Sequence, residues 1–143
     1  MRRNRRDEAL RWLRQAEEDP ADARSALERG RYHLACFLAQ QSAGKALKGF
    51  LLGQGAESVW GHSVAELADA CARLDPSFAG TRPQGAYLDR FYLPTRYPDA
   101  LPGAIPAEAF DEEDARKALG RAEDFLRRAR RALGQEGPGG QEA

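Results

Sequence analysis

The fold is decided by the stretch YHLACFLAQQSAGKALKGFLL, residues 32–52. Apolar side chains recur there every three or four residues, which is the period of an α-helix. They form two adjacent rows that occupy well over half of the helix circumference. One neighbouring helix cannot cover so wide an apolar face. Ala39, Ser42, Ala43 and Ala46 are small and permit close approach of other helices. The stretch therefore predicts a helix at the centre of a bundle or between a bundle and a second subunit, and it favours a homodimer.

The rest of the chain repeats this helical period without sustained alternation, so the predicted class is all-α. In the first helix we expect Pro20 to cause a kink or a restart, because proline lacks the amide donor. The segment Ser63-Val64-Ala65-Glu66 has the capping-box pattern that opens a helix. The expected helices are 7–28, 32–52, one from Ser63 to before Pro76, a short one near 87–93, and 111–133.

The chain has 143 residues, which suits one domain, predicted at 1–134, with a disordered tail at 135–143 that begins near Gly-Pro-Gly-Gly. Lys and Arg total 22, as do Asp and Glu, so the neutral sum excludes a strongly basic nucleic-acid module. We expect a cytoplasmic protein without a membrane span, because no stretch of about 18 apolar residues and no secretory signal occurs. Cys36 and Cys71 lie in apolar helical patterns and are expected to be reduced core thiols.

Four prolines between Pro94 and Pro106 predict a long, stiff, exposed loop. Its segment Thr95 to Asp99 combines rigidity with polar groups. Arg96 offers donors for phosphate or carboxylate, Tyr97 offers a flat face for a base, and Asp99 offers a carboxylate acceptor. These three residues are candidate ligand-binding residues. The alternative is an internal clamp in which Arg96 pairs with Asp99 or with a helix end while the tyrosines fill the core.

Other polar residues give weaker signals. Lys45 and Lys48 share the polar side of the central helix, and they either form a solvated strip or join Arg96 in an anionic-ligand site. His62 precedes the Ser63 cap and is either a turn residue or an acid–base group. No Cys/His/Asp cluster has metal-ligand spacing, and no phosphate-loop or dinucleotide-binding motif occurs, so neither a metal nor a cofactor is predicted.

The chain resembles the HEPN domains of prokaryotes, a family named for nucleotide binding. Four segments in the same order carry the resemblance, and together they span nearly the whole chain before the tail. They are ALRWLRQAEED (9–19), YHLACFLAQQSAGKALK (32–48), His62 with Leu67, and YLPTRYPD (92–99).

The resemblance implies an up-and-down bundle of four main helices with a short fifth, usually dimeric. Members often pair with a minimal nucleotidyltransferase encoded as a neighbour, and many such pairs look like toxin–antitoxin systems. Other members are metal-independent ribonucleases, in which an arginine is followed after four to six residues by a histidine that activates the ribose 2′-hydroxyl.

This sequence departs from the ribonuclease pattern. Arg96 matches the arginine, but residues 97–103 contain no histidine, and Gly44 stands where the family commonly has glutamate. The prediction is therefore a dimeric binding module that pairs with a minimal nucleotidyltransferase and binds nucleotide or RNA phosphate near Arg96. The alternatives are a ribonuclease that uses Arg96 with His62 and a purely structural helical dimer.

Overall fold

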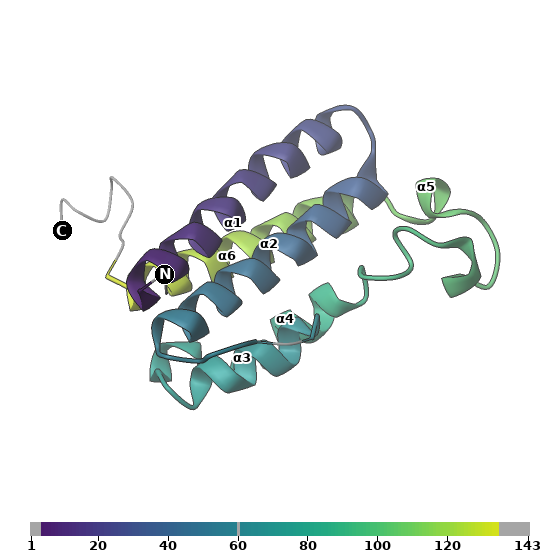
Figure 1. The fold of residues 1–143 in the computed structure, drawn as a ribbon. Coiled ribbons are helices and arrows are strands. Elements are labelled where there is room, and N and C mark those ends of the chain that lie inside the picture. The colour runs from purple at the N-terminus through teal and green to yellow at the C-terminus, as the bar shows by residue number, and fades with distance from the viewer. Residues whose placement is uncertain (1–3, 60, 135–143) are drawn as a thin grey trace.

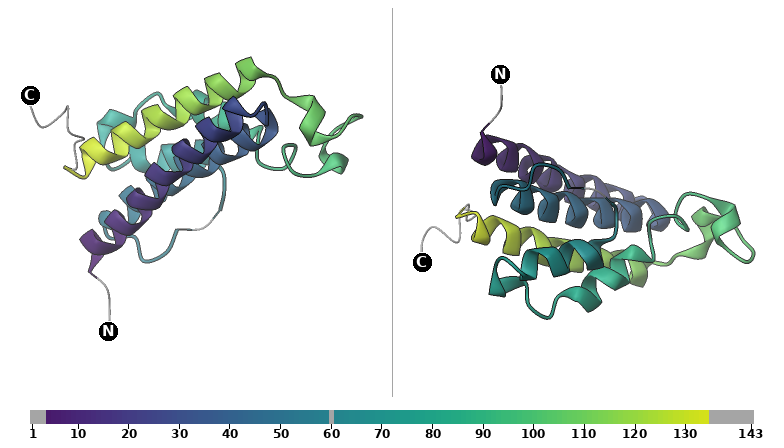
Figure 2. Two further views of the ribbon diagram at one scale, coloured as in Figure 1. Left: turned by 90° about the horizontal axis from the view of Figure 1, so that it is seen from above. Right: turned by 60° about the horizontal axis from the view of Figure 1, so that its bottom comes forward.

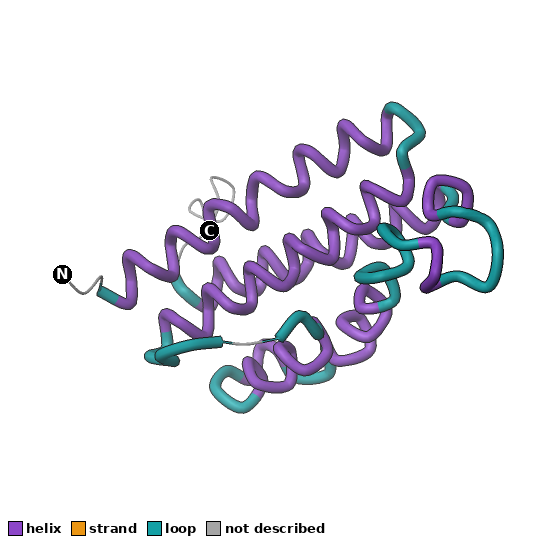
Figure 3. The backbone as a smooth tube through the Cα atoms, turned by 45° about the vertical axis from the view of Figure 1, so that its right-hand side comes forward, coloured by secondary structure: helices purple, strands orange, loops and turns teal. Residues whose placement is uncertain are grey.

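The computed structural model describes residues 4–59 and 61–134, and this part of the chain contains six α-helices and no strand (Figure 3). The predicted all-α class is confirmed. The predicted tail at 135–143 lies outside the described residues. The helices are α1 (Arg5–Glu28), α2 (Tyr32–Gly53), α3 (Val64–Ala72), α4 (Arg82–Asp89), α5 (Pro106–Ala109) and α6 (Glu112–Ala132), with 3-10 turns at Pro76–Phe78 and Pro98–Ala100.

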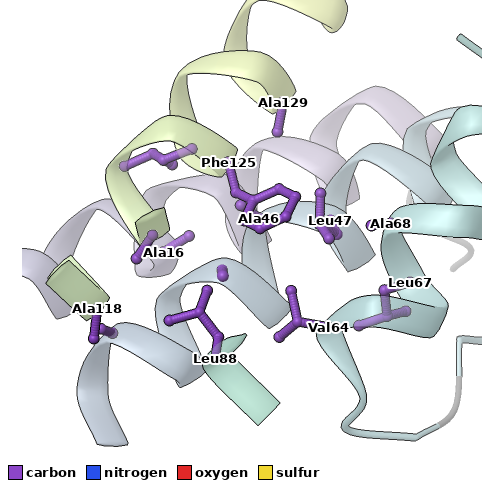
Figure 4. Close-up of a cluster of buried hydrophobic side chains, with 14 of the residues drawn as sticks. Ala16, Ala46, Leu47, Val64, Leu67, Ala68, Leu88, Ala118, Phe125 and Ala129 are labelled. Atoms are coloured by element: carbon purple, nitrogen blue, oxygen red, sulfur yellow. The ribbon is translucent and has the colours of Figure 1, made fainter. Parts of the chain in front are cut away.

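The helix α2 lies at the centre, as its sequence predicts. Long helices α1 and α6 run beside it, and α3 and α4 cover another side (Figures 1 and 2). Leu47 of α2 and Phe125 of α6 pack in one cluster with Val64 and Leu88, which come from α3 and α4 (Figure 4). This apolar core fixes the positions of the shorter helices on α2.

Pro20 neither ends nor restarts α1, which is one continuous helix through this position. A proline at position 20 leaves the carbonyl of Ala16 without its helical donor. The hydroxyl of Ser42, which is fully buried in α2, donates to this carbonyl at 2.7 Å. The expected restart is therefore wrong, because a side chain of the neighbouring helix replaces the missing backbone donor.

The expected short helix near 87–93 is displaced, because α4 begins at Arg82 and ends at Asp89. Pro83 lies in its first turn, where a helix needs no amide donor. Gly85 faces α3, and a Cβ atom there would lie 2.7 Å from the Ala65 nitrogen. Pro83 and Gly85, which are residue types typical of loops, therefore belong to a helix that packs closely on α3.

The segment between α4 and α6 extends beyond one end of the bundle (Figures 1 and 2). It is the exposed, proline-rich loop that the sequence predicts, although Pro106 starts the short α5 rather than preventing a helix. The helix α6 then begins with a capping box between Asp111 and Asp114, in which each side chain accepts from the other's backbone amide.

Both cysteines are buried and free, as predicted. Burial raises the pKa of each thiol to about 12. None of the described helices has the length and apolar character that crossing a membrane requires.

Candidate functional site

The candidate site is built on the junction of α3 and α4. The Asp89 carboxylate at the end of α4 accepts three hydrogen bonds from the start of α3: from the Val64 amide at 2.6 Å, the Ser63 hydroxyl at 2.8 Å and the Ala65 amide at 3.2 Å. Ser63 caps α3 by accepting from the Glu66 amide, which confirms the predicted start of the helix, but in the described structure the Glu66 side chain does not complete the predicted capping box. The carboxylate that completes the cap is Asp89, from a different helix.

This junction brings His62 and Tyr92 together. His62 lies two residues before α3 and Tyr92 three residues after α4. Their rings stack with centroids 4.7 Å apart and planes at 20°. A second contact fixes His62 to the central helix, because the buried Gln40 side chain donates to the His62 carbonyl at 2.9 Å. Gln40 also accepts from Gln41 at 2.8 Å, so both ends of its amide have partners.

Arg96 packs on the same Tyr92 ring. The turn that carries it is closed by the buried Thr95 hydroxyl, which donates to the Phe91 carbonyl. The Arg96 Nε donates to the Tyr92 carbonyl at 2.9 Å. Its Cζ lies 4.5 Å from the ring centroids of Phe37 and Tyr92 and 5.2 Å from that of Tyr97. We call these three rings the aromatic cage of Arg96.

The cage holds the guanidinium without neutralising it. Within residues 4–59 and 61–134, no carboxylate forms an ion pair with Arg96, and its two terminal nitrogens have no hydrogen-bond partner. Asp99, two residues past the cage residue Tyr97, is exposed and does not pair with Arg96 in the described structure. The internal clamp that the sequence offered as the alternative is thus formed only in part. The Arg96 Nε donates to the Tyr92 carbonyl, while the two terminal nitrogens of Arg96 make no hydrogen bond in the described structure.

The structure does not bring the two lysines to the cage. Lys45 Nζ pairs with the buried carboxylate of Asp19 at 2.9 Å. Lys48 Nζ lies 6.0 Å from the centroid of the Trp12 ring, and burial lowers its pKa. Both therefore face α1. Since a helix rises about 1.5 Å per residue, Lys45 is about 12 Å along α2 from the cage residue Phe37. Lys45 borders a groove of about 700 Å³ whose other lining residues belong to α1.

Sequence reasoning missed two contributors, Phe37 and Gln40. Phe37 belongs to an apolar row of α2, so nothing in its pattern distinguishes a cage residue from a core residue. Gln40 carried a usable signal, because it is a polar residue within the otherwise buried arc of α2. No group of three or more His, Cys, Asp or Glu side chains in the described ranges is placed to hold a metal ion.

The arrangement combines the unused guanidinium donors of Arg96 with the half-exposed ring of Tyr97 beside them, and the His62 imidazole lies on the Tyr92 ring that Arg96 also contacts. Two terminal nitrogens of arginine match a pair of phosphate or carboxylate oxygens in bidentate geometry. Tyr97 has 49 % of its surface exposed. The His62 imidazole and the Arg96 guanidinium both contact the Tyr92 ring. The distance between them therefore cannot exceed the sum of their distances to the centroid of that ring.

A family model for the HEPN domain matches residues 9–132. A Thermus thermophilus protein of known crystal structure is 36% identical, with a TM-score of 0.79, over 87% of this chain and 98% of that chain. The crystal structure of an archaeal HEPN homologue is 35% identical, with a TM-score of 0.73, over 93% of this chain and 99% of that chain. A HEPN domain protein from Thermotoga maritima is 27% identical, with a TM-score of 0.68, over 87% and 98%. Comparison with curated proteins finds no match.

Proposed function

Because the chain belongs to the HEPN domain family, we propose that it is a dimeric helical binding module whose Arg96 binds a phosphate of a nucleotide or an RNA. We propose further that it works as the partner of a minimal nucleotidyltransferase in a toxin–antitoxin-like pair. HEPN domains have nuclease or binding roles and often dimerise, so both parts of the proposal lie within the range of the family.

One observation carries the proposal: Arg96 is ordered by contacts that leave its terminal donors unused. Three rings and one carbonyl hold the guanidinium. A side chain ordered in advance loses less conformational entropy when a ligand binds. An arginine with a purely structural role would instead direct its fork at a carboxylate or at several carbonyls. The cage therefore supports recognition of an external anion.

Two neighbours of Arg96 add the features of a nucleotide site. The Tyr97 ring lies beside the guanidinium and is half exposed, and stacking of a base on such a ring contributes about 1–3 kcal/mol. In this proposal the exposed Asp99 carboxylate accepts a hydrogen bond from a hydroxyl or amino group of the same ligand. Lys45 and Lys48 are directed toward α1, so in this proposal they contact only an extended ligand or a partner protein.

The proposed dimer and partner contact are supported by a stripe of α2 that other helices leave partly exposed. This stripe contains apolar side chains on the same side of the helix as Lys45 and Lys48. It consists of Leu34, Phe37, Leu38, Gln41, Lys45, Lys48 and Leu52. Since Phe37 is also a cage residue, a subunit packed on this stripe would lie next to Arg96.

Calorimetric titration of the purified chain with AMP and with inorganic phosphate tests the phosphate site. Replacing Arg96 by Gln removes one bidentate charge-assisted contact, and such contacts contribute about 1.5–3 kcal/mol. The affinity for AMP should therefore fall about 10- to 100-fold. Arg24→Gln is the matched control, because it removes one positive charge from an exposed ion pair with Glu123 on another face. Equal affinities for the two variants would refute the assignment of Arg96.

Coexpression with the protein encoded next to this chain tests the partner. The proposal expects a minimal nucleotidyltransferase that co-purifies in a stoichiometric complex. A neighbour of that class that shows no association in size-exclusion chromatography would refute this part, while leaving the phosphate site to the titration.

A ribonuclease is the second candidate, because His62 and Arg96 contact the same Tyr92 ring. In that reaction His62 would take the proton of a ribose 2′-hydroxyl, and the 2′-oxygen would attack the adjacent phosphorus while Arg96 stabilises the phosphorane charge. The bond from phosphorus to the 5′-oxygen would then break, and this oxygen would leave with a proton from water, which gives a 2′,3′-cyclic phosphate. Purified chain incubated with RNA in EDTA, beside His62→Ala and Arg96→Ala, separates the candidates. Cleavage that both substitutions abolish establishes the nuclease, and cleavage that neither affects belongs to a contaminant.

A further inference from the structure

A second group of cations lies outside the Arg96 cage, where α4 meets α6. Its centre is Tyr87, whose ring is half buried. Lys117 Nζ of α6 lies 4.5 Å from the centroid of this ring, and Arg90 Cζ, at the end of α4, lies 5.2 Å from it. Arg121 is one helical turn beyond Lys117, and its charge also acts on the Tyr87 hydroxyl. We call Tyr87, Arg90, Lys117 and Arg121 the Tyr87 patch.

The cations of the Tyr87 patch differ from most others of α6 in lacking carboxylate partners. Arg116 pairs with Glu112, Arg128 with Asp124, and Arg130 with Glu17 of α1. In the described residues no ion pair is formed by Arg90, Lys117 or Arg121. Lys117 also has Glu113 one turn earlier, at a spacing that favours pairing, yet its ammonium lies over the Tyr87 ring instead.

One carboxylate does act on the patch. Asp114 contributes, after burial, to raising the pKa of Tyr87, so it lies close enough to offset part of the positive charge. Its side chain, however, accepts the Asp111 amide in the capping box of α6. With three cations against this carboxylate, the patch retains an excess of positive charge. The raised pKa keeps Tyr87 a protonated hydroxyl that can donate a hydrogen bond.

The Tyr87 patch and the Arg96 cage lie at the two ends of one short segment. Arg90 and Arg96 are six residues apart, so even a fully extended chain would separate their Cα atoms by only about 20 Å. A nucleoside monophosphate carries one phosphate group, so its phosphate engages only one of these two places. An RNA strand of several nucleotides offers phosphates to both.

We propose that the Tyr87 patch is a second phosphate-binding site for a single-stranded RNA whose other contact is the Arg96 cage. The inference rests on the proposed function and narrows its ligand class from a nucleotide or RNA to an RNA strand. Tyr87 already holds two cations on its ring, so the patch binds backbone phosphates and reads no base. A contact of this kind contributes affinity independent of sequence and sensitive to salt.

The test compares two triple variants that remove the same charge. Arg90→Gln, Lys117→Gln and Arg121→Gln together neutralise the patch. The control removes three exposed, paired arginines through Arg24→Gln, Arg82→Gln and Arg127→Gln. Fluorescence anisotropy measures the affinity of each triple variant and of the unaltered chain for a labelled 12-nucleotide RNA, between about 50 and 200 mM salt. Calorimetry measures their affinity for AMP. Circular dichroism confirms that both variants fold.

We expect the patch variant to bind the RNA at least tenfold more weakly at the lowest salt than the control variant does. The slope of log affinity against log salt should decrease by about 0.7 for each phosphate of a single strand that the patch variant no longer neutralises. AMP affinity should be the same in both variants, because AMP occupies only the cage.

Equal loss of RNA affinity in the two triple variants overturns the proposal, because net charge alone would then explain binding. Absence of RNA binding by the unaltered chain overturns it as well. The proposal is also overturned if the patch variant binds RNA with unchanged affinity but no longer binds a partner protein. The patch would then be a protein contact. If the proposed phosphate site at Arg96 is itself wrong, the unaltered chain will not bind AMP. This result is distinct from a failure of the Tyr87 patch, which leaves AMP binding intact.

Discussion

Replacing Asp89 by Asn tests whether the carboxylate that joins α4 to α3 also positions the site. One carboxylate oxygen accepts the Val64 amide, and the other accepts the Ser63 hydroxyl and the Ala65 amide. An Asn that keeps the first contact places its NH2 group against the Ala65 donor, although the Ser63 hydroxyl can turn and accept. Hydrogen bonds to charged groups contribute about 1.5–3 kcal/mol each. We therefore expect Asp89→Asn to lower the free energy of unfolding by about 2–4 kcal/mol.

Urea unfolding followed by circular dichroism measures the loss of stability. Ser63→Ala is the companion variant, because it removes the cap hydroxyl but leaves both amide contacts of Asp89 in place, and loss of a helix cap costs about 1 kcal/mol. AMP affinity, measured where both variants are folded, provides the functional readout. Asp89 touches no ligand in this scheme and acts only by positioning His62 and Tyr92, so Asp89→Asn should weaken binding more than Ser63→Ala does.

Two results would refute this reasoning. If Asp89→Asn unfolds at the same urea concentration as the unaltered chain, the three contacts do not stabilise the junction. If the variant is destabilised as expected but binds AMP with unchanged affinity, the junction does not position the site, and the turn around Arg96 must be sufficient by itself.

Three further predictions concern the core. Ser42→Ala should cost about 1–3 kcal/mol, because it leaves the buried Ala16 carbonyl without a donor, and the cost should be smaller in a Pro20→Ala background that restores the backbone amide. Equal costs in both backgrounds, measured by urea unfolding, would contradict this pairing. Cys36 and Cys71 should resist a chromogenic disulfide reagent at pH 8 in the native chain and react in denaturant, and rapid native labelling would show that one is accessible. Because the folded thiols keep their protons to about pH 12, the free energy of unfolding should fall as the pH rises from about 9 to about 12.

The helices of the bundle were predictable wherever a local pattern determines them. The central helix α2 was predicted to begin at Tyr32 and end at Leu52, and it ends one residue later at Gly53. The helix α4 was misplaced because its proline and glycine are typical of loops when only neighbours in sequence are considered. Pro83 fits the first turn of a helix, and Gly85 is required by the backbone of α3, which is distant in sequence. Close contacts of this kind leave no local signature.

The candidate site shows the same limit. Arg96 was identified from its stiff loop, and the structure gives it unused donors, which the sequence could not show. One partner of Arg96 and one partner of its neighbour His62 come from α2, where Phe37 and Gln40 are more than twenty residues away along the chain. The unsuspected partner of Lys45 is Asp19 of α1. Composition and spacing identify charged residues, but tertiary packing decides which of them are neutralised.

This distinction changes what the neutral composition means. A sum of 22 basic and 22 acidic residues excludes a general polycation, but it does not determine how many cations are available to a ligand. Several arginines of α1 and α6 pair with carboxylates across or along those helices, where such exposed pairs add little stability and keep the surface neutral. Arg96 in its cage, and Arg90 and Lys117 of the Tyr87 patch, lie instead over aromatic rings, which attract a positive charge without cancelling it. Aromatic support thus gives a neutral protein two places where positive charge is not paired with a carboxylate in the described residues. If the proposed function holds, RNA affinity should depend on these few positions rather than on the total charge.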